Sequence, residues 1–187
     1  PGEKIKQEAS DYVSLMTPVV KSLFTDLAME ITNDAMQIHG GYGYTKDQGI
    51  EQLYRDNRIT PIYEGTNSVQ AIDLVFRKVL NNDFLSKFIK IIRSEINLHN
   101  DKPELKKFSI ILEKNLKILE DFVNWLKDRN NTNKDDVSSA CNDFLKVLGY
   151  ISIGFCWFKI SKVSLNKINE NKNFYEDKIN TAKYFYD

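Results

Sequence analysis

MQIHGGYGYTKDQGIEQLYRDNRITPIYEGTNSVQAIDLVFRKV, residues 36–79, is the stretch that decides how this chain is interpreted. It places one carboxylate, Glu64, between the apolar pair Ile62–Tyr63 and a turn at Gly65–Thr66. Apolar neighbours keep water from a carboxylate and raise its pKa toward the range of a base that removes protons from carbon. Gly65 has no side chain, so a ligand can approach the backbone closely there. The stretch therefore predicts a general base at Glu64.

Working outward from this stretch, apolar residues at helical spacing predict an all-α fold, a helical bundle with a helical extension. The expected helices cover residues 17–39, 50–57, 67–79, 84–98, 105–126 and 137–165, with a last one around 179–185. Thr17 and Pro18 are expected to cap and begin the first helix. Asn67 is expected to cap the third, with Gln70 completing a capping-box-like pattern. Residues 41–49 read as a loop, 59–66 as an extended turn, 100–103 as a break and 128–136 as a linker. No strand is expected.

Composition excludes several classes of function. Lys plus Arg equals Asp plus Glu at 26 each, so no global field draws the chain to nucleic acid or to an anionic membrane. Cys141 and Cys156 lie on one predicted helix, where a bridge between them is implausible. Reduced cysteines indicate a cytoplasmic location. The apolar run 147–158 has 12 uncharged residues, too few to cross a bilayer, and no ligand spacing predicts a metal site.

At residues 37–70 the chain resembles the acyl-CoA dehydrogenase family. QIHGGYGYTKDQGIEQLYRDNRI followed by IYEGTNSVQ reproduces, in order and spacing, the segment before the catalytic glutamate, the YRD-x-RI stretch and the EGT signature. MTPVVKSLFTD upstream and QAIDLVFRKVL downstream resemble the subclass with an additional C-terminal helical region. The resemblance implies two units: residues 1–80 as the end of the family's C-terminal helical domain, and residues 81–187 as the helical extension.

The resemblance also implies a site. Glu64 would be the base that takes the α-proton of an acyl-CoA thioester while a β-hydride passes to FAD, and Gly65 would contact the substrate. Thr66, Asn67 and Ser68 match a flavin-contacting stretch. A second flavin contact, to the FAD of a neighbouring subunit, corresponds to Gln37, Ile38, His39, Gly40 and Gly41. A homo-oligomer is therefore expected, with electron-transfer flavoprotein as the electron acceptor.

The same residues could have simpler structural roles. Glu64 could be an ordinary helix-start carboxylate, and Gly40–Gly41 a simple helix stop. Tyr54, Arg55, Asp56 and Arg58 could bind phosphate, although we expect Asp56 to pair with an arginine and hold the loop that presents Glu64. The family's N-terminal helical domain and middle β domain have no counterpart here, so we expect the chain alone to be inactive. The rival interpretation is a non-enzymatic helical association module from a split or decayed gene.

Overall fold

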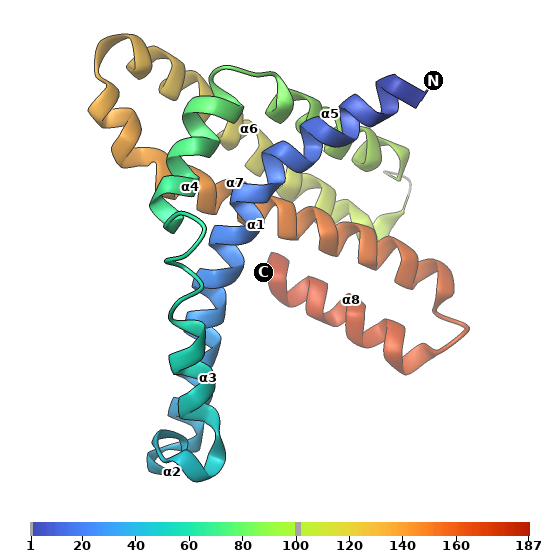
Figure 1. Cartoon of the computed structure of the whole chain (residues 1–187). Coiled ribbons are helices and arrows are strands. Elements are labelled where there is room, and N and C mark those ends of the chain that lie inside the picture. Colours follow the sequence, from blue (N-terminus) through green and yellow to red (C-terminus); the bar gives the residue numbers. More distant parts are fainter. Residues whose placement is uncertain (1, 100–101) are drawn as a thin grey trace.

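The computed structural model describes residues 2–99 and 102–187, and every regular element in them is helical (Figure 1). The α-helices are α1 Gly2–His39, α2 Gly41–Tyr44, α3 Ile50–Asn57, α4 Asn67–Asp73, α5 Phe84–Leu98, α6 Pro103–Thr132, α7 Lys134–Lys167 and α8 Lys172–Tyr186. A 3₁₀ turn, η1 Lys46–Gln48, follows α2, and a π-helical segment, η2 Leu74–Val79, continues α4. The all-α prediction is confirmed. Asn100 and Asp101 of the predicted break lie outside the described residues.

Helix α1 corrects the expectation that a helix begins at Thr17–Pro18. It starts at Gly2 and carries Pro18 in its interior, where Thr17 donates its hydroxyl to the Val13 carbonyl at 2.7 Å instead of capping. An interior proline normally weakens a helix by about 3 kcal/mol because it lacks an N–H. The helix persists because the turns before Pro18 bury side chains, among them Leu15 at 0% exposure.

Residues 128–136 are not a linker, which corrects a second expectation. Helix α6 continues to Thr132 and α7 begins at Lys134, so Asn133 alone separates them. The Asn133 side chain accepts a hydrogen bond from the backbone N–H of Asp135 at 3.1 Å and caps α7. The polar residues of this run face solvent because they lie at the ends of two helices.

Residues 41–49 are more ordered than the loop expected from the sequence, because α2 and η1 lie there. With α3 and the second half of α1 they form an arm, residues 24–57, that projects from the rest of the molecule (Figure 1). At 1.5 Å per residue, the 38-residue α1 is about 57 Å long. Several large apolar side chains of the arm face solvent: Phe24, Ile31, Ile38, Tyr42, Tyr44 and Leu53.

Helix α7 is the central element of the core. It packs against α1, α4, η2, α6 and α8, and a single cluster of buried apolar residues runs from Leu15 through Phe88 to Phe158. At Gly149 the helices approach so closely that a Cβ would lie 2.7 Å from Leu23 of α1. The region before residue 81 and the region after it therefore share one core.

Helix α7 is also long and apolar enough, by length and composition, to cross a membrane. We expected the apolar run 147–158 to be too short to cross a bilayer. The helix that contains it is long enough, because its apolar character extends past Lys146 and Lys159. Half of its most apolar 18-residue window is buried inside the molecule. Its packing, rather than its length, is that of a core helix.

Candidate active site

Glu64 occupies an unusual backbone conformation. Its φ is +55°, which makes it the one non-glycine residue with positive φ in the described part of the chain, and Gly65 follows at φ +82°. A left-handed glutamate is uncommon, and such strained positions concentrate at functional sites. The Gln70 side chain stabilises the turn by donating to the Glu64 carbonyl at 2.8 Å. The peptide N–H of Glu64 has no hydrogen-bond partner among the described residues.

The carboxylate of Glu64 is not shielded in this chain. Glu64 is exposed, and its neighbours Ile62 and Tyr63 are themselves 45% and 49% exposed. The expectation that Ile62 and Tyr63 exclude water from Glu64 is therefore wrong for the chain by itself. Any apolar cover over the carboxylate has to come from another part of the protein or from a ligand.

The loop that carries Glu64 is fixed to α1 by a polar network. Lys21 donates to the Gly65 carbonyl at 2.9 Å and to the Asn67 side-chain oxygen at 2.8 Å. The Asn67 amide nitrogen lies 2.7 Å from an Asp26 carboxylate oxygen and 2.9 Å from the Thr25 hydroxyl. Charge-assisted contacts of this kind are the stronger hydrogen bonds in proteins. They hold residues 65–67 against the middle of α1.

Thr66, not Asn67, caps α4. The Thr66 side chain accepts from the Val69 N–H at 3.4 Å, and Asn67 is the first residue of the helix. Gln70 reaches back to Glu64 instead of completing a capping box. Local sequence could not distinguish these arrangements, because the Asn67 side chain bonds α1 residues more than forty positions away instead of capping α4. Lys21 and Asp26 were missed for the same reason: a charged residue on a long helix carries no local signal of its distant partner.

The residues assigned to a second flavin contact lie at the tip of the arm. Gln37, Ile38, His39, Gly40 and Gly41 are all exposed. His39 sits at the end of α1 with its Nδ1 2.9 Å from the Ala35 carbonyl. Eighteen residues of α1 separate His39 from Lys21, about 27 Å of helix. The stretch 37–41 therefore lies at the tip of the arm and the stretch 66–68 lies outside the arm, beside Lys21, so the two do not form one site.

The YRD stretch lies on α3 and does not pair as expected. Arg55 approaches Glu51 at 3.6 Å, whereas Asp56 forms no ion pair among residues 2–99 and 102–187. The prediction that Asp56 pairs with an arginine is wrong, because the i,i+4 spacing places Glu51 beside Arg55. The loop that carries Glu64 is instead held by Lys21 and Asn67.

Two family profiles match the chain in succession. The profile described as "Acyl-CoA dehydrogenase, C-terminal domain" matches residues 3–79, and the one described as "Acetyl-CoA dehydrogenase C-terminal like" matches residues 85–187. The chain belongs to the acyl-CoA dehydrogenase family. It comprises a C-terminal domain of that family and the helical extension that follows it.

Curated relatives match two different extents of the chain. The 3-methylmercaptopropionyl-CoA dehydrogenase of Ruegeria pomeroyi is 45% identical over 80 residues, covering 43% of this chain and 14% of the relative. The 3-(aryl)acrylate reductase of Clostridium sporogenes is 52% identical over 71 residues, covering 38% and 17%. The broad-specificity linear acyl-CoA dehydrogenase FadE5 of Mycobacterium tuberculosis is 28% identical over 184 residues, covering 91% and 30%. The chain thus spans less than a third of the length of these relatives.

Proposed function

We propose that this chain is the C-terminal, base-bearing part of an FAD-dependent acyl-CoA dehydrogenase that introduces a double bond between Cα and Cβ of an acyl-CoA thioester. One observation carries the proposal: Glu64, the residue that matches the glutamate of the family signature, lies in a left-handed turn held by Gln70 and Lys21. A base held in a fixed position works through geometry first and pKa second.

In this proposal Glu64 removes the α-proton, and its carboxylate becomes a neutral acid. The thioester carbonyl accepts from the N–H of Glu64, which has no partner among residues 2–99 and 102–187. This hydrogen bond stabilises negative charge on the carbonyl oxygen as the proton leaves. Gly65, without a Cβ, leaves room for the thioester beside the backbone. Bound FAD would accept the β-hydride and so complete the two-electron oxidation.

The residues around Glu64 suit a polar cofactor in part. Thr66 and Ser68 are exposed at the start of α4, where side-chain oxygens and a helix start favour polar groups. Asn67 is already engaged, since its side chain bonds α1 and its N–H donates to the Pro61 carbonyl at 3.2 Å. We therefore assign Asn67 a positioning role beside the flavin. The separate stretch Gln37–Gly41 would serve the FAD of a neighbouring subunit in a homo-oligomer.

The wider setting follows from the same proposal. An enzyme of this kind passes its electrons to electron-transfer flavoprotein, and we place it in the cytoplasm because both cysteines are free. Glu64 is exposed, so the apolar surroundings that catalysis needs have to be supplied by the parts of the enzyme outside this chain. We expect no turnover from the chain alone.

The test is Glu64→Gln in the complete enzyme that contains this sequence. The amide preserves shape but cannot accept the α-proton, so FAD and acyl-CoA should still bind while flavin reduction slows. Loss of a general base costs on the order of 10²–10⁴ in rate. The measurement is anaerobic bleaching of the flavin absorbance after adding acyl-CoA. Bleaching of the variant at a rate close to wild type would move the base to another carboxylate.

The second candidate is a non-enzymatic association module. The exposed apolar side chains of the arm favour it, because such surfaces bind partners. The flavin absorbance spectrum of the complete protein that contains this sequence distinguishes the two functions. An enzyme should purify yellow with stoichiometric FAD, whereas an association module should purify without it.

A further inference from the structure

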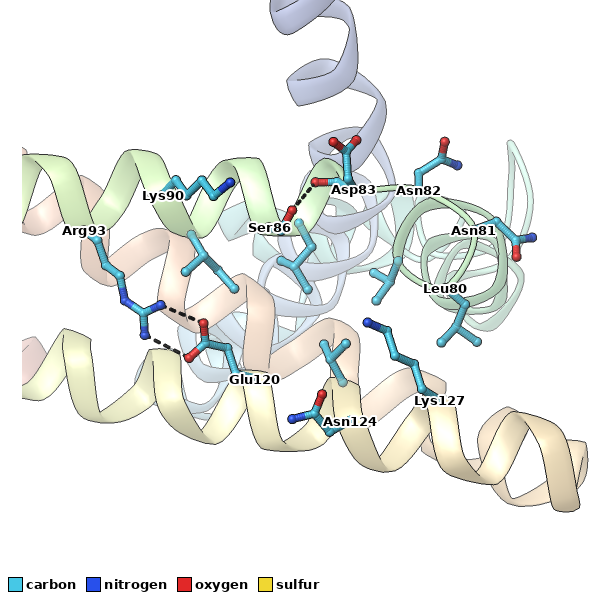
Figure 2. A pocket seen from close by; sticks show the side chains of 14 residues that line it. Leu80, Asn81, Asn82, Asp83, Ser86, Lys90, Arg93, Glu120, Asn124 and Lys127 are labelled. Carbon is cyan, nitrogen blue, oxygen red and sulfur yellow. Dashed lines mark hydrogen bonds and ion pairs between the residues drawn. The ribbon is translucent and has the colours of Figure 1, made fainter.

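A cavity of about 560 Å³ opens where α5 begins, between the end of η2 and the second half of α6 (Figure 2). Its volume falls within the range of roughly 300–1,000 Å³ that small-molecule sites occupy. The floor is apolar and consists of Val79, Leu85, Ile89 and Val123. Fourteen helical residues, about 20 Å, separate Leu80 at its rim from Thr66. This cavity is therefore distinct from the site around Glu64.

The cavity presents unpaired positive charge. Lys127 and Asn124 project from α6 toward its interior (Figure 2), and Lys127 forms no ion pair within the described ranges 2–99 and 102–187. Helix α5 starts at the opposite rim, and its N-cap residue, Asp83, forms no side-chain cap hydrogen bond within the described part of the chain. The first N–H groups of a 15-residue helix carry partial positive charge. An ammonium group and a helix start therefore face the same space.

Of the other charged side chains that line the cavity, Arg93, Glu120 and Asp83 are paired, whereas Lys90 forms no ion pair among residues 2–99 and 102–187. Arg93 bonds Glu120 at 2.7 Å and Glu113 at 2.9 Å, and these two glutamates hold the pKa of Arg93 above its ordinary value, with Glu120 the larger cause. Asp83 pairs with Lys87 at 2.9 Å. Lys90, Arg93 and Lys127 against Asp83 and Glu120 give the lining three positive and two negative charges, a net charge of +1. An incoming anion would meet an attractive field without displacing an existing ion pair.

We propose that this cavity binds an anionic amphiphile, a molecule with a carboxylate or phosphate head and a short apolar body. The head lies between Lys127 and the start of α5, within reach of the Asn124 amide, and the body covers the floor around Leu85 and Val123. Both parts are needed, because a surface lysine alone holds an anion weakly and the floor alone does not select one. The site does not depend on the function proposed for Glu64.

Isothermal titration calorimetry of the full 187-residue chain with octanoate tests the proposal. Octyl phosphate distinguishes the two head groups, while octanol and inorganic phosphate each lack one half of the ligand. Octanoate or octyl phosphate should bind measurably, and octanol and inorganic phosphate at least about tenfold more weakly. Equal binding of octanol and octanoate, or no heat from either amphiphile at millimolar concentration, would overturn the site.

Two variants locate the binding. Lys127→Gln should weaken octanoate binding by about tenfold, as expected for the loss of one charge-assisted hydrogen bond. Lys106→Gln on the same helix, also exposed and outside the cavity, should bind like wild type. Asn124→Phe should fill the cavity and abolish binding at an unchanged melting temperature, since Asn124 is exposed. Undiminished binding by Lys127→Gln or by Asn124→Phe would refute the assignment.

Discussion

Asn67 shows how a single side chain can determine where the loop that carries Glu64 lies. Its amide contacts α1 residues more than forty positions away, and its neighbour Gly65 is bound by the same Lys21. Glu64 directly precedes these residues, so its position is fixed relative to α1, the longest helix of the described chain. The position of Glu64 is thus set by α1, which itself contributes no residue to the chemistry proposed at Glu64.

Asn67→Ala should lower the free energy of unfolding by about 1–3 kcal/mol, because Lys21 and Asp26 lose a partly buried hydrogen-bond partner. Urea denaturation measures the difference. Asn173→Ala, at an exposed position of α8, is the matched control and should change stability by less than about 0.5 kcal/mol. Similar small effects for both variants would mean that the network to α1 does not hold the loop.

At the residue scale, the sequence predicts Glu64 as the base but does not predict its surroundings. The signature identifies Glu64 without any knowledge of α1, because the motif is local. The expected apolar cover over Glu64 was wrong because Ile62 and Tyr63 are adjacent in sequence yet open to solvent in the fold. Exposure of a turn depends on what packs over it, which no neighbouring residue encodes.

Among the elements, α3, α5 and α7 were predictable to within three residues, whereas α8 begins seven residues before its predicted start. Helix α5 spans Phe84–Leu98, as its pattern indicates. The errors occurred where polar residues or proline suggested a boundary: Pro18 lies inside α1, and the run 128–136 consists of two helix ends. Tertiary burial on either side outweighed the local signal. The start of α1 was missed because the turns before Pro18 have partners on distant elements, among them Lys87 of α5, which donates to Asp11.

One of those partners gives α1 and α5 a pH-dependent contact. Asp11, 5% exposed, accepts from Lys87 of α5 at 2.8 Å and from Gln7 at 2.8 Å. These hydrogen bonds, that from Lys87 first, hold the pKa of Asp11 below its ordinary value. The folded state therefore binds this proton less readily than the unfolded chain, whose aspartate has a pKa of about 3.9. The stabilisation is present above that pH and is lost as the pH falls through the folded pKa.

Asp11→Asn should accordingly make the stability of the chain less sensitive to acid. The free energy of unfolding, measured by denaturant titration at pH values from about 5 to 2, should fall less steeply than in wild type. At pH 7 the variant should be less stable, since Lys87 loses a buried partner. Asp177→Asn, at an exposed position of α8, should retain the wild-type slope. An unchanged slope in Asp11→Asn would show that other carboxylates dominate the acid response.

The molecule as a whole exposes more surface than its size requires. A compact monomer of 21.7 kDa has an accessible surface of about 9,200 Å² by size scaling, whereas this chain has 11694 Å². The arm contributes to this excess of accessible surface, because it projects away from the core (Figure 1). The difference, about 2,500 Å², is comparable with the surface that obligate interfaces bury.

This excess leads to the prediction that the isolated chain self-associates. Phe24 and Ile31 lie seven residues apart on one face of α1 and are 55% and 65% exposed, so they form an apolar stripe along the arm. Burying such a stripe against a second copy is favourable by roughly 25 cal/mol per Å². Light scattering after gel filtration should therefore give the mass of a dimer or a larger species.

The double variant Phe24→Lys and Ile31→Lys should shift that equilibrium toward monomer at the same protein concentration, because two ammonium groups would have to be desolvated in the interface. Tyr184→Lys, at an 86% exposed position of α8, should leave the mass unchanged. A wild-type chain that stays monodisperse and monomeric at high concentration would contradict the prediction. The arm would then have to fold back in solution, and its apolar side chains would no longer be available to a neighbouring subunit.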